Sequence, residues 1–162
     1  MARKDAAEKL RGEAQYVGDL VVPRMLHGKV LRSPFPHARI VSIDTSEADA
    51  MPGVVTVLTG KDLLDIDPYY GHAIKDRTIL AIDRVRFAGE PVAAVAAIDE
   101  ATAEAAVLTI VVEYEELPIV GTVDEALAEG AQLVHDQPTR PGAFHGLGTL
   151  PERDGNICYR YT

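Results

Sequence analysis

The sequence predicts an α+β fold, with a mixed β-sheet built on two strand–helix–strand units and short helices. Residues 92–98 form an unbroken apolar run, which indicates a strand covered on both faces. The order strand, helix, strand occurs over residues 38–58 and again over 92–117. In each unit an Ile-Asp pair, Ile43-Asp44 or Ile98-Asp99, closes the first strand and places a carboxylate that can cap the helix. We therefore expect parallel pairing within each unit, by right-handed crossovers.

The first 64 residues contain three expected strands. Alternation is clearest over residues 38–44, where Val41 and Ile43 lie opposite Ile40 and Ser42. Each proline of the Ser-Pro-Phe-Pro segment biases its predecessor away from helix, so an irregular connector is expected there. In chain order the expected elements are a short helix over residues 6–10, a strand over 25–32, the strand over 38–44, a helix over 46–51 that Pro52-Gly53 ends, a strand over 54–58 and a turn that Thr59 caps.

Proline and glycine set the boundaries of the later elements. Pro91 has no amide donor, so we expect it as the first residue of the strand that follows the Gly89-Glu90 bend. The alanine-rich helix over 100–108 is expected to turn Ala101, Ala105 and Leu108 toward the core. The other expected elements are a polar, aromatic loop over 65–76, a strand over 110–117, an acidic helix over 124–129 with Gly130 in the C′ position, and a strand over 156–161 without a visible partner.

The net charge and the number of cysteines exclude several classes of protein. The chain has 25 Asp and Glu against 16 Lys and Arg, a formal net charge of −9, which argues against nucleic-acid and anionic-membrane partners. The single cysteine excludes an internal disulfide framework. No apolar run approaches the ~20 residues of a membrane-spanning helix, and residues 1–15 lack the apolar centre of a signal peptide. We therefore expect a cytoplasmic protein of one domain with an appended tail.

Candidate metal ligands and nucleophiles are scattered along the chain. They are His27, His37, His72, His135, His145 and Cys158. Because the histidines show neither HxH nor HxxxH spacing, a zinc or iron site would need distant loops to converge, and we interpret them as ordinary surface or loop residues. Cys158 lies in an expected strand, away from a helix N-terminus or a base, and is interpreted as a small buried apolar residue.

Two glycine motifs fail as nucleotide sites. The Gly-x-Gly within residues 145–149 neither follows a strand nor opens a helix, as a dinucleotide fingerprint requires. Gly60-Lys61 is followed by Asp62 instead of Ser or Thr, and it lacks an upstream glycine at P-loop spacing. We expect neither motif to bind phosphate.

Acidic side chains cluster in the last expected strand and the helix after it. They are Glu113, Glu115, Glu116, Asp124 and Glu125. Paired carboxylates can perform acid–base chemistry when they are buried. Because these alternate with apolar residues on a strand, a solvated face is the favoured interpretation.

Four further polar residues are candidates for chemistry. Ser33 lacks the Gly-x-Ser-x-Gly elbow and recognisable His and Asp partners. Arg84 and Arg86 flank Val85 on one strand face, where they could hold an acidic partner surface or be exposed to solvent. Glu90 is the base in the bend before the buried strand. The residues alone therefore predict a compact domain without a self-contained active site.

Five segments in chain order carry a resemblance to a known family. Residues 11–19 contain GEAQYVGD, 31–40 contain RSPFPHARI, 52–62 contain PGVV and LTGKD, 80–93 contain VRFAGEPVA, and 112–118 read VEYEELP. Together they resemble the large, molybdenum-binding subunits of the xanthine dehydrogenase and aldehyde oxidase family, which includes carbon monoxide dehydrogenase. The resemblance implies the a/b hammerhead domain that begins those subunits. We expect this domain over residues 1–131 and a Gly/Pro-rich tail over 132–162 that leads toward an absent cofactor-binding domain.

The same resemblance implies that the reactive machinery lies elsewhere. In that family the molybdenum-cofactor contacts and the catalytic glutamate follow the hammerhead domain, so no catalytic, cofactor-binding or metal-ligating residue is carried over to this sequence. The complete enzyme would use a molybdopterin-type molybdenum cofactor, [2Fe-2S] clusters and FAD to oxidise aldehydes, purines, other N-heterocycles or carbon monoxide with oxygen from water. The implied partners are the remaining cofactor-binding part of the large subunit, the iron–sulfur subunit and, as a further candidate, the FAD subunit.

Three hypotheses follow. The first is a structural domain of a molybdenum hydroxylase, as a fragment or a split subunit, that is inactive and free of cofactor by itself. The second is a stand-alone binding or adaptor protein that reuses the hammerhead fold without catalysis. The third, a self-sufficient small enzyme, has no constellation of nucleophile, base and orienting group to support it. A reading frame that continues beyond Thr162 would favour the first hypothesis over the second.

Overall fold

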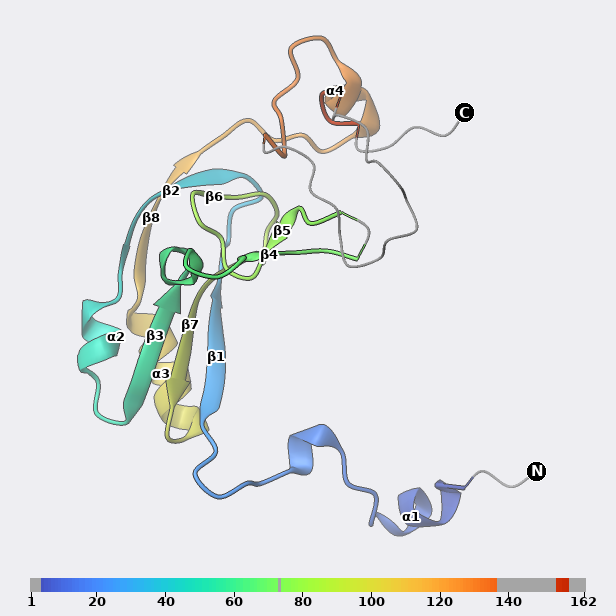
Figure 1. The fold of residues 1–162 in the computed structure, drawn as a ribbon, viewed down its shortest axis with the longest axis vertical. Coiled ribbons are helices and arrows are strands. Elements are labelled where there is room, and N and C mark those ends of the chain that lie inside the picture. The colour runs from blue at the N-terminus through green and yellow to red at the C-terminus, as the bar shows by residue number, and fades with distance from the viewer. Residues whose placement is uncertain (1–3, 73, 137–153, 158–162) are drawn as a thin grey trace.

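Two three-stranded antiparallel sheets form the body of the computed structural model, which describes residues 4–72, 74–136 and 154–157 (Figure 1). The first sheet has the order β1-β7-β3 and the second has the order β6-β2-β8. A two-stranded ribbon of β4 and β5 lies in the segment that connects them. The strands are β1 (His27–Arg32), β2 (Ala38–Asp44), β3 (Val54–Thr59), β4 (Tyr69–Tyr70), β5 (Arg77–Thr78), β6 (Arg84–Val85), β7 (Pro91–Ala97) and β8 (Val111–Glu116).

Short helices connect the strands. They are α1 (Ala6–Arg11), α2 (Ser46–Ala50), α3 (Glu100–Thr109) and α4 (Val123–Leu127), with the 3-10 turns η1 (Val17–Asp19) and η2 (Gly60–Leu63). Helix α3 lies behind the β1-β7-β3 sheet and packs against β1 and β7, while α2 packs against β3 and α3 (Figure 1). No helix in the described parts of the chain combines the length and the apolar character that a bilayer crossing requires.

The α+β class is confirmed, but the expected parallel pairing within each strand–helix–strand unit is wrong. The units β2-α2-β3 and β7-α3-β8 each pass from one sheet to the other, so no unit pairs its own strands. Instead β3 pairs antiparallel with β7, and β2 pairs antiparallel with β8. The linker over residues 45–53 is shorter than the ~12 residues that a parallel crossover needs, which is one physical reason for this topology.

Strand β7 joins the two hydrophobic cores, as its apolar run predicts. Ala93 and Val95 belong to the core beneath α2 and α3, whereas Val92 belongs to the core around Val85 and Ala38. Both faces of the strand are therefore covered. The strand begins at Pro91 as expected, and it ends at Ala97, one residue before the expected end.

Helix α3 begins as predicted but presents a different face. The Asp99 carboxylate accepts a hydrogen bond of 2.7 Å from the Thr102 amide, so the expected cap is confirmed. The buried residues are Ala103 and Ala106, whereas Leu108 is 84% exposed, so the expected core face is wrong. In an alanine-rich helix all faces are similarly apolar, so the spacing of apolar residues does not show which face of the helix packs against the sheet.

The remaining elements agree with the sequence apart from their ends. The other predicted strands match β1, β2, β3 and β8, and the polar loop over 65–76 contains the unpredicted strand β4. Asp44 accepts a hydrogen bond from the Ser46 amide, but Thr45 is the N-cap residue of α2. Helix α4 ends at Leu127, before the predicted end, so Gly130, with φ 74°, lies beyond the C′ position. Of the strand predicted over 156–161, residues 158–161 lie outside the described part.

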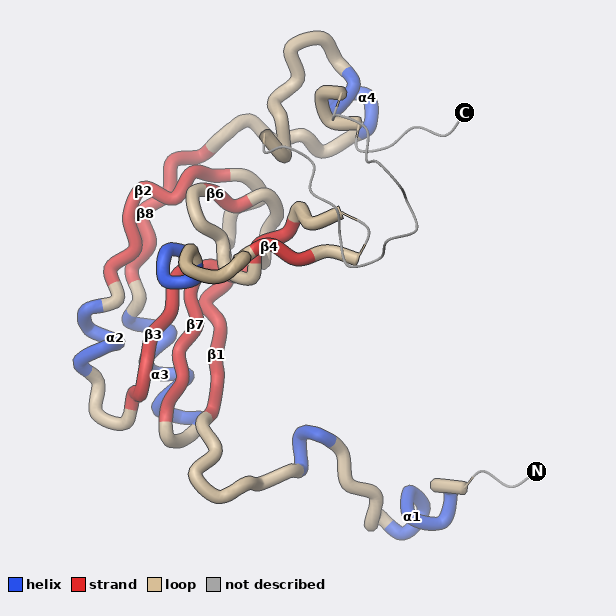
Figure 2. Tube along the Cα trace, viewed as in Figure 1, coloured by secondary structure: helices blue, strands red, loops and turns tan. Residues whose placement is uncertain are grey.

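Residues 4–26 lie on one side of the body, and α4 with residues 154–157 lies on the other (Figure 1). Residues 4–26, with α1 and η1, project away from the first residues of β1, as Figure 1 shows. Helix α4 and the turn of residues 154–157 lie at the other side. Figure 2 shows that these two regions consist mainly of loop, whereas the strands gather in the body. The region of α4 and residues 154–157 is joined to the body by polar contacts of Arg84, Arg86 and Asn156.

Candidate docking region around the 84–90 turn

The bend between β6 and β7 is fixed by backbone hydrogen bonds to the Ser33 connector. The Ser33 amide donates to the Glu90 carbonyl at 2.9 Å, and the Gly89 amide donates to the Ser33 carbonyl at 2.8 Å. The Arg32 guanidinium donates to the Gly89 carbonyl at 2.8 Å. Ser33 is buried, and its hydroxyl accepts a hydrogen bond from the Phe35 amide at 3.0 Å. Ser33 therefore shapes the connector.

Glu90 is a buried carboxylate within this bend. Its side chain is 4% exposed and accepts a hydrogen bond of 2.5 Å from the Arg86 amide. Burial raises the pKa of Glu90 above its ordinary value of 4.5, against the opposing effect of the Arg86 amide and cation. By accepting this hydrogen bond from the backbone, the Glu90 carboxylate holds the turn between β6 and β7 closed.

Arg84 and Arg86 hold the segment of residues 134–136 against β6. The Arg84 guanidinium forms an ion pair of 2.8 Å with Asp136, and Arg86 Nε donates to the Val134 carbonyl at 3.1 Å. The Arg86 side chain is only 9% exposed. The expected alternative of simple exposure to solvent is therefore wrong, and the groups that Arg84 and Arg86 bind in the structure belong to their own chain.

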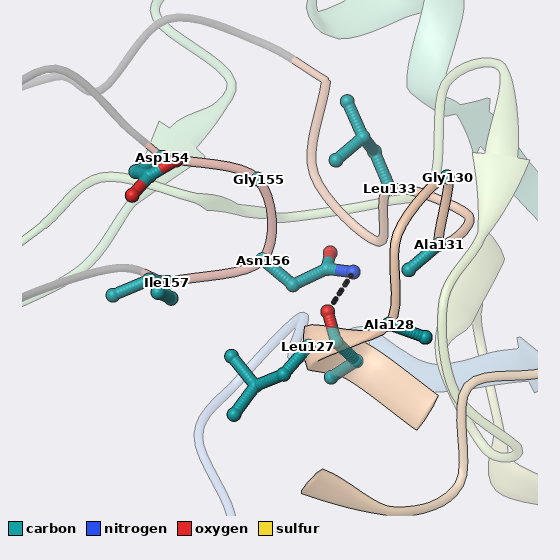
Figure 3. A pocket seen from close by; sticks show the side chains of 10 residues that line it. Leu127, Ala128, Gly130, Ala131, Leu133, Asp154, Gly155, Asn156 and Ile157 are labelled. Carbon is teal, nitrogen blue, oxygen red and sulfur yellow. Dashed lines mark hydrogen bonds between the residues drawn. The ribbon is translucent and has the colours of Figure 1, made fainter. Parts of the chain in front are cut away.

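Asn156 makes a second attachment in this region. Its side-chain oxygen accepts from the Val134 amide at 2.9 Å, and its side-chain nitrogen donates to the carbonyls of Gln132 at 2.9 Å and Ala126 at 3.3 Å. Figure 3 shows a hydrogen bond of the Asn156 side chain as a dashed line. We call Arg84, Arg86, Glu90, Asn156 and residues 132–136 the junction. The sequence did not predict the roles of Asn156 and Asp136. A turn signal such as Asp154-Gly155 predicts a local bend, but it does not show which distant segment the turn contacts.

A pocket of about 470 Å³ lies beside Asn156, between α4 and the turn of residues 154–157 (Figure 3). Its walls are mostly small or aliphatic, including Leu127, Leu133 and Ile157. Asp154 is the one ionisable residue among its ten lining residues. This composition gives the pocket no set of groups for acid–base or metal chemistry.

The histidines do not converge in the described part of the chain. His37 is buried and its Nδ1 lies 2.7 Å from the Pro118 carbonyl, so Nδ1 carries the proton and donates. Its Nε2 is buried without a hydrogen-bond partner. His27, His72 and His135 lie apart on β1, a loop and the junction, and among residues 4–72, 74–136 and 154–157 no group of three His, Cys, Asp or Glu could hold a metal ion.

The acidic cluster lies on a solvated face, as the alternation predicts. Glu113 accepts from the Ser42 hydroxyl at 3.1 Å, and Glu115 pairs with Arg39 at 3.5 Å with both side chains more than half exposed. Glu125 instead accepts from the Gly121 and Thr122 amides at the start of α4. Asp124 and Glu116 are exposed. These carboxylates bind neighbouring polar groups and solvent.

Gly60 has a packing role. A Cβ atom at this position would overlap the backbone carbonyl of Ala81, so only glycine permits the close approach of η2 to that segment. Lys61 is exposed beside it. Cys158, His145 and the Gly-x-Gly of residues 145–149 lie outside the described residues.

Comparison with known proteins places this fold in one family. The model of the "Aldehyde oxidase and xanthine dehydrogenase, a/b hammerhead domain" matches residues 11–118. A relative from Bacillus subtilis, a probable xanthine dehydrogenase subunit, is 46% identical over 98% of this chain, which spans 19% of that relative.

Solved structures agree with this result. Quinoline 2-oxidoreductase from Pseudomonas putida 86 has 41% identity and a TM-score of 0.75, over 84% of this chain and 18% of that one. Reconstituted CO dehydrogenase from Oligotropha carboxidovorans has 37% identity and a TM-score of 0.76, over 81% and 16%. The chain thus spans about a fifth of the relatives it matches. It belongs to the aldehyde oxidase and xanthine dehydrogenase family and corresponds to the a/b hammerhead region of the large subunits of these molybdenum hydroxylases.

Proposed function

We propose that this chain is the architectural domain of a molybdenum hydroxylase large subunit and performs no chemistry by itself. Its role is to pack against the cofactor-binding remainder of that subunit. One observation carries the proposal: the buried ionisable side chains Glu90 and Arg86 bind backbone groups of their own chain. Charges used in this way hold the fold and are not available to a substrate.

The complete enzyme, in this proposal, holds a molybdopterin-type molybdenum cofactor, [2Fe-2S] clusters and FAD, and works in the cytoplasm. It oxidises aldehydes, purines, other N-heterocycles or carbon monoxide, with an iron–sulfur subunit as a direct partner and an FAD subunit as a further one. Among the described residues no group of three His, Cys, Asp or Glu could hold a metal ion. We therefore assign no step of the reaction to them.

We further propose that the hammerhead domain spans residues 1–131 and that residues 132–162 lead toward the cofactor-binding region. The junction supports a defined start for this segment, because Arg84 of β6 and the following Arg86 bind Asp136 and the Val134 carbonyl, and Asn156 binds the Gln132 carbonyl. A segment fixed in this way would leave the domain in a defined direction.

Affinity purification of the protein from its native cells tests the proposal. We expect the chain to be recovered within, or bound to, a molybdenum-containing large subunit together with an iron–sulfur protein. Recovery as a free chain, without molybdenum and without these proteins, would instead support the stand-alone adaptor.

A further inference from the structure

Residues 16–25, which we call the arm, are an apolar segment outside the body. Tyr16, Val17, Leu20, Val21 and Val22 are all at least half exposed, and Val17 and Val21 reach 87%. Figure 1 shows the arm projecting away from both sheets. Such a density of exposed apolar side chains is typical of surfaces that bind another protein surface.

The arm has a defined shape despite its exposure. The Tyr16 amide donates to the Asp19 carboxylate at 2.9 Å, and the Leu20 amide donates to the Val17 carbonyl at 3.3 Å. The Met25 amide donates to the Val22 carbonyl at 3.0 Å, next to Arg24 with its positive φ of 63°. These local bonds restrict the backbone of the segment, which lowers the entropic cost of docking.

The arm is part of the family domain, since the family match begins at residue 11. It nevertheless contributes no residue to either hydrophobic core among the described residues. A shared segment that the domain core does not use points to a contact outside the domain.

We propose that the arm docks into an apolar groove on the cofactor-binding remainder of the large subunit. The inference rests on the proposed function. In the Bacillus relative the matched region is 19% of the length, so most of the polypeptide lies outside the domain and is tethered to it. Tethering gives such a surface a high effective concentration, which favours it over a separate protein.

The distribution of charge favours docking of the arm on the rest of the large subunit over docking on a second copy of this chain. Residues 11–25 carry Arg11, Glu13, Asp19 and Arg24 and have a formal net charge of zero, so an apolar groove suits them. Two copies of the chain would each carry −9 and repel each other.

Photo-cross-linking in the full enzyme tests the inference. A photoreactive amino acid is placed at Val17 or at Val21 of the protein in its native cells, and the products are mapped by mass spectrometry. We expect cross-links to large-subunit residues beyond Thr162. A matched control at Leu108, which is 84% exposed on α3, should not label the same peptides. Cross-links only to the iron–sulfur subunit, to a second copy or within residues 27–136, no cross-link, or equal labelling from Leu108 would overturn the inference.

A second measurement uses the trypsin site at Arg24. In the assembled enzyme, Val17→Asp combined with Val21→Asp should expose this site and speed cleavage after Arg24 at least tenfold, relative to the unsubstituted enzyme. An unchanged rate would contradict docking of the arm, and if the variant fails to fold the cross-linking result decides. Failure of the proposed function is recognised separately, because the unsubstituted protein would then be purified without molybdenum and without a larger subunit.

Discussion

At the scale of single residues, Glu90 shows how a buried charge is used here. Its carboxylate is 4% exposed and binds the Arg86 amide inside the bend that begins β7. Burial raises its pKa, so the native chain keeps a proton at pH values where the unfolded chain has released it. The free energy of unfolding contributed by this group therefore falls as pH rises from about 4.5 through the raised pKa, and it is level above that range.

Glu90→Gln removes this titration and keeps an oxygen that can accept from the Arg86 amide. We expect the free energy of unfolding of the variant, relative to the unsubstituted chain, to rise between pH 4.5 and the raised pKa, then stay constant. Urea unfolding of both proteins at a series of pH values measures the difference. A difference that is flat over pH 4 to 8 would contradict the assigned role of burial.

At the scale of elements, the longer strands β1, β2, β3, β7 and β8 were predictable, whereas the buried face of α3 was not. The runs that became β2 and β7 carry the period and the apolar content of strands, and Asp99 is a local capping signal. In α3 several faces consist of alanine, so only packing against β7 selects the buried one. The pairing of strands was missed for a related reason: each unit crosses between sheets, and its partner strand is distant in sequence.

Two substitutions of alanine by leucine test which face of α3 is buried. Ala106→Leu inserts a larger side chain at a position with 0% exposure and should lower the free energy of unfolding by about 1–3 kcal/mol. Ala105→Leu adds the same atoms on the exposed face and should be close to neutral. Thermal unfolding of the two variants compares them, and equal losses of stability would show that the assigned face is wrong.

The junction was also beyond local sequence reasoning, because its contacts join residues far apart in the chain. Asn156→Ala removes hydrogen bonds to Val134, Gln132 and Ala126, each contributing a net ~1 kcal/mol in typical cases. We expect faster amide hydrogen exchange over residues 132–136, with the exchange of β7 unchanged.

Gln132→Ala is the matched control for the junction, since its side chain makes an exposed contact of 3.3 Å with the Leu133 carbonyl. It should leave exchange over residues 132–136 close to that of the unsubstituted chain. Similar exchange in the Asn156 variant and in this control would mean that Asn156 does not hold the segment.

At the scale of the whole molecule, one strand joins the two hydrophobic cores and several polar side chains join segments that are distant in the sequence. The two hydrophobic cores share β7, and the polar residues singled out from the sequence, Ser33, Arg84 and Arg86, bind the backbone or an ion-pair partner of the same chain. The candidate site was thus partly predictable. The sequence offered Arg84 and Arg86 as holders of an acidic partner surface or as exposed residues. In the structure Arg84 pairs with Asp136 of the same chain and Arg86 binds the Val134 carbonyl, and the distance along the chain concealed both contacts.

Metal analysis of residues 1–162 purified alone, after circular dichroism has verified folding, tests most directly the claim that the chain is architectural. We predict molybdenum and iron far below one atom per chain and no turnover of aldehydes or purines. Molybdenum or iron near one atom per chain, or turnover by this polypeptide without added cofactor, would contradict that claim.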